Sequence, residues 1–336
     1  MAATAEQAAA EAAVWVEAFS QASESLQENT AGTVRSAWLS FDGWYDPILV
    51  AALAAEMADL STAAQQTTAG LSAQYAAEAA AAVLGIPAAP LPRNLWTPVR
   101  GGAPIRLVHS RPAEVFKRAI ATGASHQDAL ERAGARGVGL ALSDLSLEDR
   151  AVQQEVLKRL GVEQFRRVIR PELSKTGSCG LCIAAASRIY NTGDLMPLHP
   201  PSCNCIVLPI VGDVDPGFDL NEEDLAKLYD AAGSNKAVDL RRTGFTSLDE
   251  LRSAPYAVHE HGELGPLIAR TGDKFRGPNK VALEDDPERA ARMLTKVEPV
   301  LVSLEERAAA GEKVADPLAY QRELVARLRG IVADAA

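Results

Sequence analysis

Apolar side chains recur every three or four residues along the first part of the chain. One helical face in residues 1–30 carries four of them: Trp15, Phe19, Ala22 and Leu26. A second apolar series follows Asp46-Pro47, where proline suits the first turn of a helix, and it runs to a stop signal at Gly85-Ile86-Pro87. The pattern predicts two long helices joined by a short aromatic segment, in the form of a helical hairpin.

The pattern changes after this hairpin. Residues 87–112 contain six prolines, and we interpret them as an extended linker. Helical patterns then resume near Ala113, after Ser125 and after Ser146, where Ser146-Leu-Glu-Asp149 resembles a capping box.

Short apolar runs and turns replace the helical spacing in residues 162–216. The segment Cys205–Val211 is the best candidate for a strand, and Pro209 favours the edge of a sheet. Residues 244–285 look rich in loops. Beyond them, Asp286-Pro287 and Asp316-Pro317 each indicate the start of another helix.

These elements predict a mainly α protein with a small α+β centre. We divide the chain into four parts: an N-terminal helical region at 1–86, the linker at 87–112, a core at 113–267 and a C-terminal helical extension at 268–336.

Composition limits the classes of function. The formal net charge of −10 argues against a dedicated nucleic-acid-binding protein, because phosphate contacts need clustered Lys and Arg. No stretch of about 18 uncharged apolar residues occurs, so we expect no membrane span. Aromatic residues make up only 5% of the chain, while alanine is abundant in the first ninety residues, which favours closely packed helices.

All four cysteines lie within 27 residues of one another, between Cys179 and Cys205. The cluster reads Cys179-Gly-Leu-Cys182, then His199-Pro-Pro-Ser-Cys203-Asn-Cys205. A tight pair of thiolates followed by a second knuckle is typical of a tetrahedral zinc site. The ligands would be either all four cysteines or three cysteines with His199. Unliganded core thiols and disulfides are the alternatives to a structural zinc ion.

The residues around this cluster resemble the core of the MuF-like phage head-morphogenesis proteins. The likeness is most specific at Cys-x-x-Cys and at the His199–Cys205 knuckle, and it spans roughly residues 110–267. His199 and Cys203 lie one residue further apart than the family pattern has them. The version found in actinobacterial tailed phages, usually encoded beside the portal gene, is the most similar, and it shares a segment like Val258-His-Glu-His-Gly-Glu-Leu-Gly-Pro266.

The resemblance implies a minor capsid protein that acts in head assembly near the portal. Its partners would be the portal protein and the major capsid or scaffold protein, with a possible contact to packaged DNA and with no membrane and no small-molecule substrate. It would be assembled in the host cytoplasm and end inside the virion head. Relatives in this gene position are often labelled capsid maturation proteases, so an enzyme that cleaves capsid or scaffold proteins is the first alternative. A DNA-contacting ejection protein is the second.

Candidate catalytic residues for a protease are few. The sequence contains neither the His-Glu-x-x-His motif of zinc proteases nor a Gly-x-Ser-x-Gly elbow. His259 and His261 remain, since in an extended segment both would point the same way and could flank a nucleophile such as Ser253. A polar loop is the simpler interpretation of this segment.

One further group of residues is a candidate for interactions. Arg166, Arg167 and Arg170 precede the cysteine cluster and could bind DNA phosphates or an acidic portal surface. A solvated helix or strand face is the alternative.

Overall fold

The computed structural model describes ten stretches of the chain: residues 5–85, 100, 103–170, 186, 189–192, 205–218, 220–221, 256–261, 265–270 and 286–335. These residues form seven helices, a three-stranded antiparallel sheet in the middle of the chain, and a separate two-stranded sheet. The predicted class, mainly α with a small β-containing centre, is confirmed at this level. Most of the Cys/His cluster lies outside the described residues.

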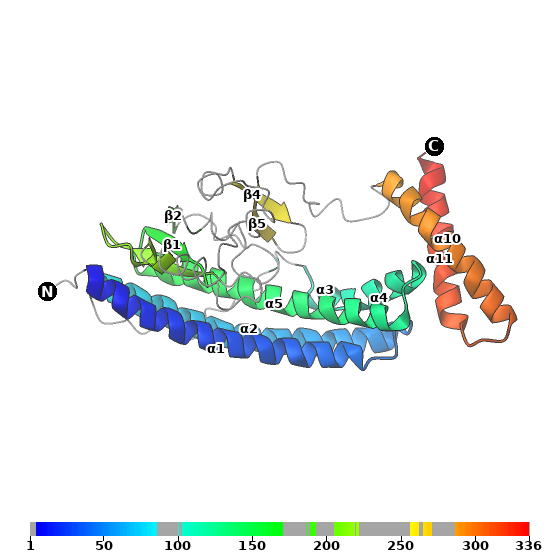
Figure 1. Ribbon diagram of the computed structural model, residues 1–336, viewed down its shortest axis with the longest axis horizontal. Helices are drawn as coiled ribbons and strands as arrows, with labels where there is room; N and C mark the ends of the chain where they lie inside the picture. Colours follow the sequence, from blue (N-terminus) through cyan, green and yellow to red (C-terminus); the bar gives the residue numbers. More distant parts are fainter. Residues whose placement is uncertain are drawn as a thin grey trace, which may run out of the picture.

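Three long helices form the body of the molecule. They are α1 (Ala5–Leu39), α2 (Pro47–Leu84) and α5 (His126–Arg159), which lie side by side along the long axis of the molecule (Figure 1). The start of α2 is set by Asp46, whose carboxylate accepts the backbone N–H groups of Ile48 and Leu49. Its end is set by Gly85, which has a positive φ of 66°.

The turn between α1 and α2 packs against the short helix α4 (Arg111–Ala121), and the shorter α3 (Ile105–His109) contacts α2. Aromatic side chains fill this end of the body. The rings of Trp44 and Phe116 stack with their centroids 4.1 Å apart, and Trp38 is fully buried beside them. The aromatic segment expected between the two helices is therefore the core that holds α4 on the body.

The three-stranded sheet lies at the opposite end of the body. It contains β1 (Gln164–Val168), β2 (Ile189–Asn191) and β3 (Ile206–Ile210), in the order β2-β1-β3. Residues of α1 and α2 pack with Val168, Ile206 and Leu208, while Leu157 of α5 packs with Phe165 and Val207. The sheet is thus held between the ends of the long helices. β3 is an edge strand, as Pro209 predicted.

Four further elements complete the described chain. They are the hairpin strands β4 (Tyr256–His261) and β5 (Gly265–Arg270), and the helices α10 (Pro287–Ala309) and α11 (Ala315–Asp334). The helix pair α10–α11 lies beyond α4, at the far end of the molecule from the sheet (Figure 1). Asp286 caps α10 as predicted, by accepting the N–H of Arg289.

Two expectations about local structure are wrong. Ser146 does not begin a helix, because α5 runs without interruption from His126 to Arg159. Leu140, Leu145 and Val152 are buried along its length, so packing continues through the apparent capping box. The region 244–285 is not all loop, since β4 and β5 pair as an antiparallel hairpin within it.

The predicted domain boundaries stay a prediction, but helices on both sides of the expected linker share one core. Residues of α1 and α2 pack with residues of α4 and α5 in a single buried cluster that includes Trp38, Met57, Phe116 and Ala133. The N-terminal helices are therefore part of the same packed body as the first half of the expected core.

One helix, α2, is long and apolar enough to cross a membrane by length and composition alone. An 18-residue window of it has a mean hydropathy of 1.4, and 33% of that window is buried. In this structure α2 packs against α1 and α5 and carries buried Ser61, Gln65 and Ser72. Core helices of soluble proteins pass the same test, so the observation is weak evidence for a span.

The close approach of α1 and α5 generates a prediction. A methyl group at Gly137 would lie 2.6 Å from Cδ1 of Trp38, a fully buried ring. Gly137→Ala should therefore lower the free energy of unfolding by about 1–3 kcal/mol, the usual cost of overpacking a core. Urea unfolding followed by circular dichroism measures this change.

The matched control is Gly139→Ala, two residues along the same helix, where an added methyl group would meet nothing within 4 Å. It should raise stability, by up to about 1 kcal/mol, because alanine favours a helix over glycine. Equal effects of the two substitutions would show that α1 and α5 do not approach each other as described.

Candidate functional site

Only one residue of the predicted Cys/His cluster lies in the described part of the chain. This is Cys205, which directly precedes β3. Cys179, Cys182, His199 and Cys203 lie outside the described residues. Among the residues that the structure does describe, no three His, Cys, Asp or Glu side chains gather as a metal site. The zinc site therefore stays a prediction, and the structure shows where its last residue is anchored.

Cys205 is buried, with 3% of its surface exposed, between two arginine side chains. Nη2 of Arg150, from α5, lies 3.5 Å from its sulfur and also donates to its backbone carbonyl. Nη1 of Arg167, from β1, lies 3.6 Å from the same sulfur. Positive charge beside a sulfur favours the thiolate, which is the form of cysteine that binds metals. The arginines thus make this position chemically suitable for a metal ligand.

The elements around Cys205 are fixed by polar contacts to the long helices. The hydroxyl of Tyr75, on α2, donates to the carbonyl of Val207 at 2.8 Å and so ties β3 to the body. Asp149 accepts from the hydroxyl of Ser72 at 2.6 Å, and one of its oxygens lies 3.2 Å from the guanidinium of Arg150. Because Arg150 is held in this way, the start of β3 has a defined position on the body.

The three arginines predicted as an interaction patch are buried instead of forming an open surface. Arg166 makes a forked ion pair with Asp215, with its Nε and Nη2 2.8 and 2.6 Å from Oδ2. Arg170 donates to Glu17 of α1 at 2.6 Å, and this hydrogen bond lowers the pKa of Glu17. Each of the three arginines is at most 6% exposed. In the described fold their roles are therefore ion pairing and packing, a correction to the expected basic patch.

The predicted catalytic candidates are only partly described. His259 and His261 lie in β4, where they pair with Leu267 and Gly265 of β5. The backbone is therefore extended at both histidines, as the hypothesis of a shared orientation requires, and the expected polar loop is wrong at these positions. Ser253 lies outside the described residues, so no geometry joins it to either histidine.

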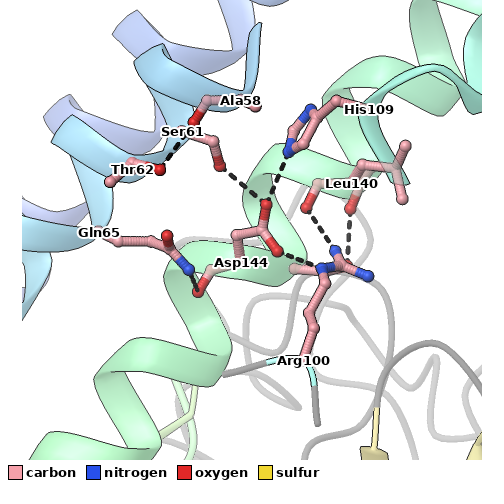
Figure 2. Close-up of polar contacts among 10 residues, drawn as sticks. Ala58, Ser61, Thr62, Gln65, Arg100, His109, Leu140 and Asp144 are labelled. Atoms are coloured by element: carbon pink, nitrogen blue, oxygen red, sulfur yellow. Dashed lines mark hydrogen bonds and ion pairs between the residues drawn. The ribbon is translucent and has the colours of Figure 1, made fainter. Parts of the chain in front are cut away.

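A buried polar cluster that the sequence did not indicate lies between α2, α3 and α5 (Figure 2). Its centre is the carboxylate of Asp144, on α5, which is fully buried. Oδ2 accepts from the hydroxyl of Ser61 at 2.8 Å and lies 2.9 Å from Nε2 of His109. Oδ1 accepts from Nε of Arg100, whose Nη2 also donates to the carbonyl of Leu140 at 3.0 Å. The cluster joins four separate segments of the chain.

This cluster contains a serine, a histidine and an aspartate but does not have the geometry of a hydrolase. In a catalytic triad the histidine lies between the other two, so that it can take the proton of the serine. Here the carboxylate of Asp144 lies between Ser61 and His109, and the serine hydroxyl donates to it. All three side chains are fully buried, so a substrate could not reach them. The arrangement suits a structural role.

The electrostatic balance at Asp144 follows from these contacts. Burial raises the pKa of its carboxyl group, but the hydrogen bond from His109 and the charge of Arg100 outweigh burial, and the net pKa lies below the ordinary value of 3.8. A carboxylate with a depressed pKa stabilises the fold above its unfolded-state pKa. That contribution is lost as the pH falls through the folded-state value.

We therefore predict a different acid sensitivity for Asp144→Asn. At neutral pH the variant should be less stable by about 3–5 kcal/mol, since it removes the buried carboxylate charge that pairs with Arg100. The difference between wild type and variant should shrink as the pH falls below about 4, where the unfolded chain begins to bind the proton, and it should be lost below the lowered folded-state pKa of Asp144. Urea unfolding between about pH 2 and pH 7 measures both stabilities.

Asp128→Asn, at an exposed position in the first turn of α5, is the control. It should change stability by about 1 kcal/mol or less at neutral pH. A stability difference for Asp144→Asn that stays constant across the whole pH range would contradict the assigned charge state.

Comparisons of the chain with protein-family models, with curated proteins and with solved structures find no match.

Proposed function

We propose that this chain is a MuF-like minor capsid protein with a structural role in assembling a tailed-phage head near the portal. The observation that carries the proposal is the placement of Cys205. The last cysteine of the motif that resembles that family directly precedes β3, an edge strand of the three-stranded sheet, and arginines from α5 and β1 flank its sulfur. A cysteine knuckle braced in this way stabilises a fold and needs no substrate access.

The helical body supports an assembly role more than an enzymatic one. The one serine, histidine and aspartate cluster among the described residues is sealed from solvent. The long helices α1, α2 and α5 instead form an elongated body (Figure 1), and the proposed role has this body contact the portal and the major capsid or scaffold protein. Such a protein would lie inside the virion head after assembly in the host cytoplasm.

The charge distribution bears on the alternative of a DNA-contacting ejection protein. Among residues 1–92, Arg35 is the only basic residue, against ten acidic residues. Arg166, Arg167 and Arg170 are buried, and Arg166 and Arg170 pair with carboxylates. Both facts count against DNA binding by these parts of the chain, because DNA affinity depends on accessible positive charge.

The knuckle would hold one structural zinc ion as part of this proposal. Its ligands would come from Cys179, Cys182, His199, Cys203 and Cys205. The buried thiol of Cys205, beside two guanidinium groups, fits a thiolate ligand. The ion would cross-link the chain around the sheet, with no open position for a substrate.

The zinc proposal predicts one metal ion per chain in the purified protein. Cys203→Ser and Cys205→Ser should each lose the metal and lower the melting temperature, because a structural zinc ion contributes directly to folding. Elemental analysis by mass spectrometry and thermal unfolding measure the two effects.

Ser202→Ala, which changes a neighbouring residue with no soft ligand atom, is the matched control and should keep the metal. A wild-type protein that lacks metal, and that is still destabilised by Cys205→Ser, would instead support the alternative of unliganded core thiols.

The assembly proposal is tested by co-expression with the portal and major capsid proteins encoded in the same genome. We expect the chain to co-purify with the portal or with procapsids, and the major capsid protein to keep its full-length mass. Intact-mass spectrometry with and without this chain provides the measurement.

A capsid protein that is shortened only in the presence of this chain, with the cleavage lost in His259→Ala or His261→Ala, would establish the maturation protease instead. Binding to DNA fragments that weakens steeply with salt, with no portal association, would favour the ejection protein.

A further inference from the structure

The helix pair α10–α11 has a core of its own. Val297 on α10 and Leu324, Val325 and Leu328 on α11 are buried together, and Ala121 is the one fully buried member of this cluster that comes from the body. A second cluster, with Leu304 and Leu318, closes the turn between the two helices. The buried apolar contacts of the pair therefore lie mostly between its own two helices.

Ion pairs on its surface also join the two helices to each other. Arg322 on α11 contacts Glu305 on α10 at 3.0 Å, and Arg329 contacts Glu298 at 2.7 Å. Exposed pairs of this kind add little stability, but they show that the polar side chains of the helix pair are matched internally. The contacts described so far thus lie mostly within the helix pair and involve few residues of the body.

The contact with the body is centred on a buried glutamine. Gln321 is 1% exposed, and its Nε2 donates to the carbonyl of Ala121 at 2.9 Å and to the carbonyl of Val297 at 2.7 Å. Ala121 is the last residue of α4, where helical geometry leaves carbonyl groups without a partner in their own helix. A side chain of α11 therefore caps the end of α4.

Two aromatic contacts surround this cap. The ring of Tyr320 meets the ring of Tyr45 edge-to-face, with their centroids 5.9 Å apart, and Nζ of Lys117 lies 5.8 Å from the centre of the Tyr320 ring. Burial raises the pKa of both tyrosines to about 12, so both stay neutral at physiological pH. These contacts between the helix pair and the body are partly polar and involve the turn before α2, α4 and the residues just after it.

We infer that α10–α11 is an independently folded arm that can release from the body as a rigid unit, with the Gln321 cap on α4 holding it in place. When the arm releases, its own core and ion pairs stay intact. The carbonyl of Ala121 can then accept a hydrogen bond from water. Release therefore replaces the hydrogen bond from Gln321 with one from water. The inference does not depend on the proposed function.

Hydrogen exchange of the full-length protein, read by mass spectrometry, tests the inference. In Gln321→Ala the amides at the end of α4, residues 121–124, should exchange about tenfold faster, the effect of losing roughly one hydrogen bond. Amides within α10 and α11 should stay as protected as in the wild type, except near Val297, whose carbonyl also loses its bond from Gln321. Glu323→Ala, two residues away at an exposed position of the same helix, is the control and should change neither region.

A second variant, Tyr45→Ala, loosens the same interface from the side of the body and leaves the arm unchanged. It should produce the same pattern of exchange, which keeps the test decisive if Gln321→Ala does not fold. Faster exchange throughout α10 and α11 in Tyr45→Ala would show that the arm needs the body to fold. No change at residues 121–124 in either variant would show that this contact does not hold the arm, and either result would overturn the inference.

Discussion

A fully buried carboxylate, that of Asp144, constrains how the helices of this protein can be arranged. A charge removed from water is tolerated only when other groups replace the lost hydration, and here Ser61, His109 and Arg100 do so from three other segments. Each partner must be in place for the others to be stable. The register of α2 against α5, and the positions of residue 100 and α3, therefore follow from one side chain. The alanine-rich faces allow the close approach, but they do not by themselves select one register.

Polar contacts between remote segments also fix the other end of the body, where the sheet is attached. Arg150 extends the polar series along α5 and reaches the start of β3, while Tyr75 bonds to the backbone of that strand. Both contacts join an element of the sheet to a long helix, and neither is between strands. A small sheet of short strands has little stability of its own. Its position, and with it the position of Cys205, depends on the helical body.

Local signals predicted the parts of this fold that local chemistry determines. The cap at Asp46, the cap at Asp286 and the edge position of the strand with Pro209 all follow from the residue and its immediate neighbours. The failures arise where the deciding partner is remote in sequence. Arg166 and Arg170 looked like an exposed patch, because Asp215 and Glu17 lie 49 and 153 residues away along the chain. Asp144 lies among the leucines of α5, but its partners Ser61, Arg100 and His109 lie 83, 44 and 35 residues away along the chain.

This division also explains why the candidate site could be predicted only in part. The cysteine motif is a local pattern, and its last residue, Cys205, directly precedes β3. What surrounds Cys205 is not local, since one arginine comes from α5 and the other from β1, 55 and 38 residues before it. The guanidinium of Arg150 also lies 3.2 Å from the carboxylate of Asp149, so its charge has a partner within α5 as well. The helical body therefore does more than support the start of β3: it supplies one of the two guanidinium groups that lie beside the sulfur of Cys205.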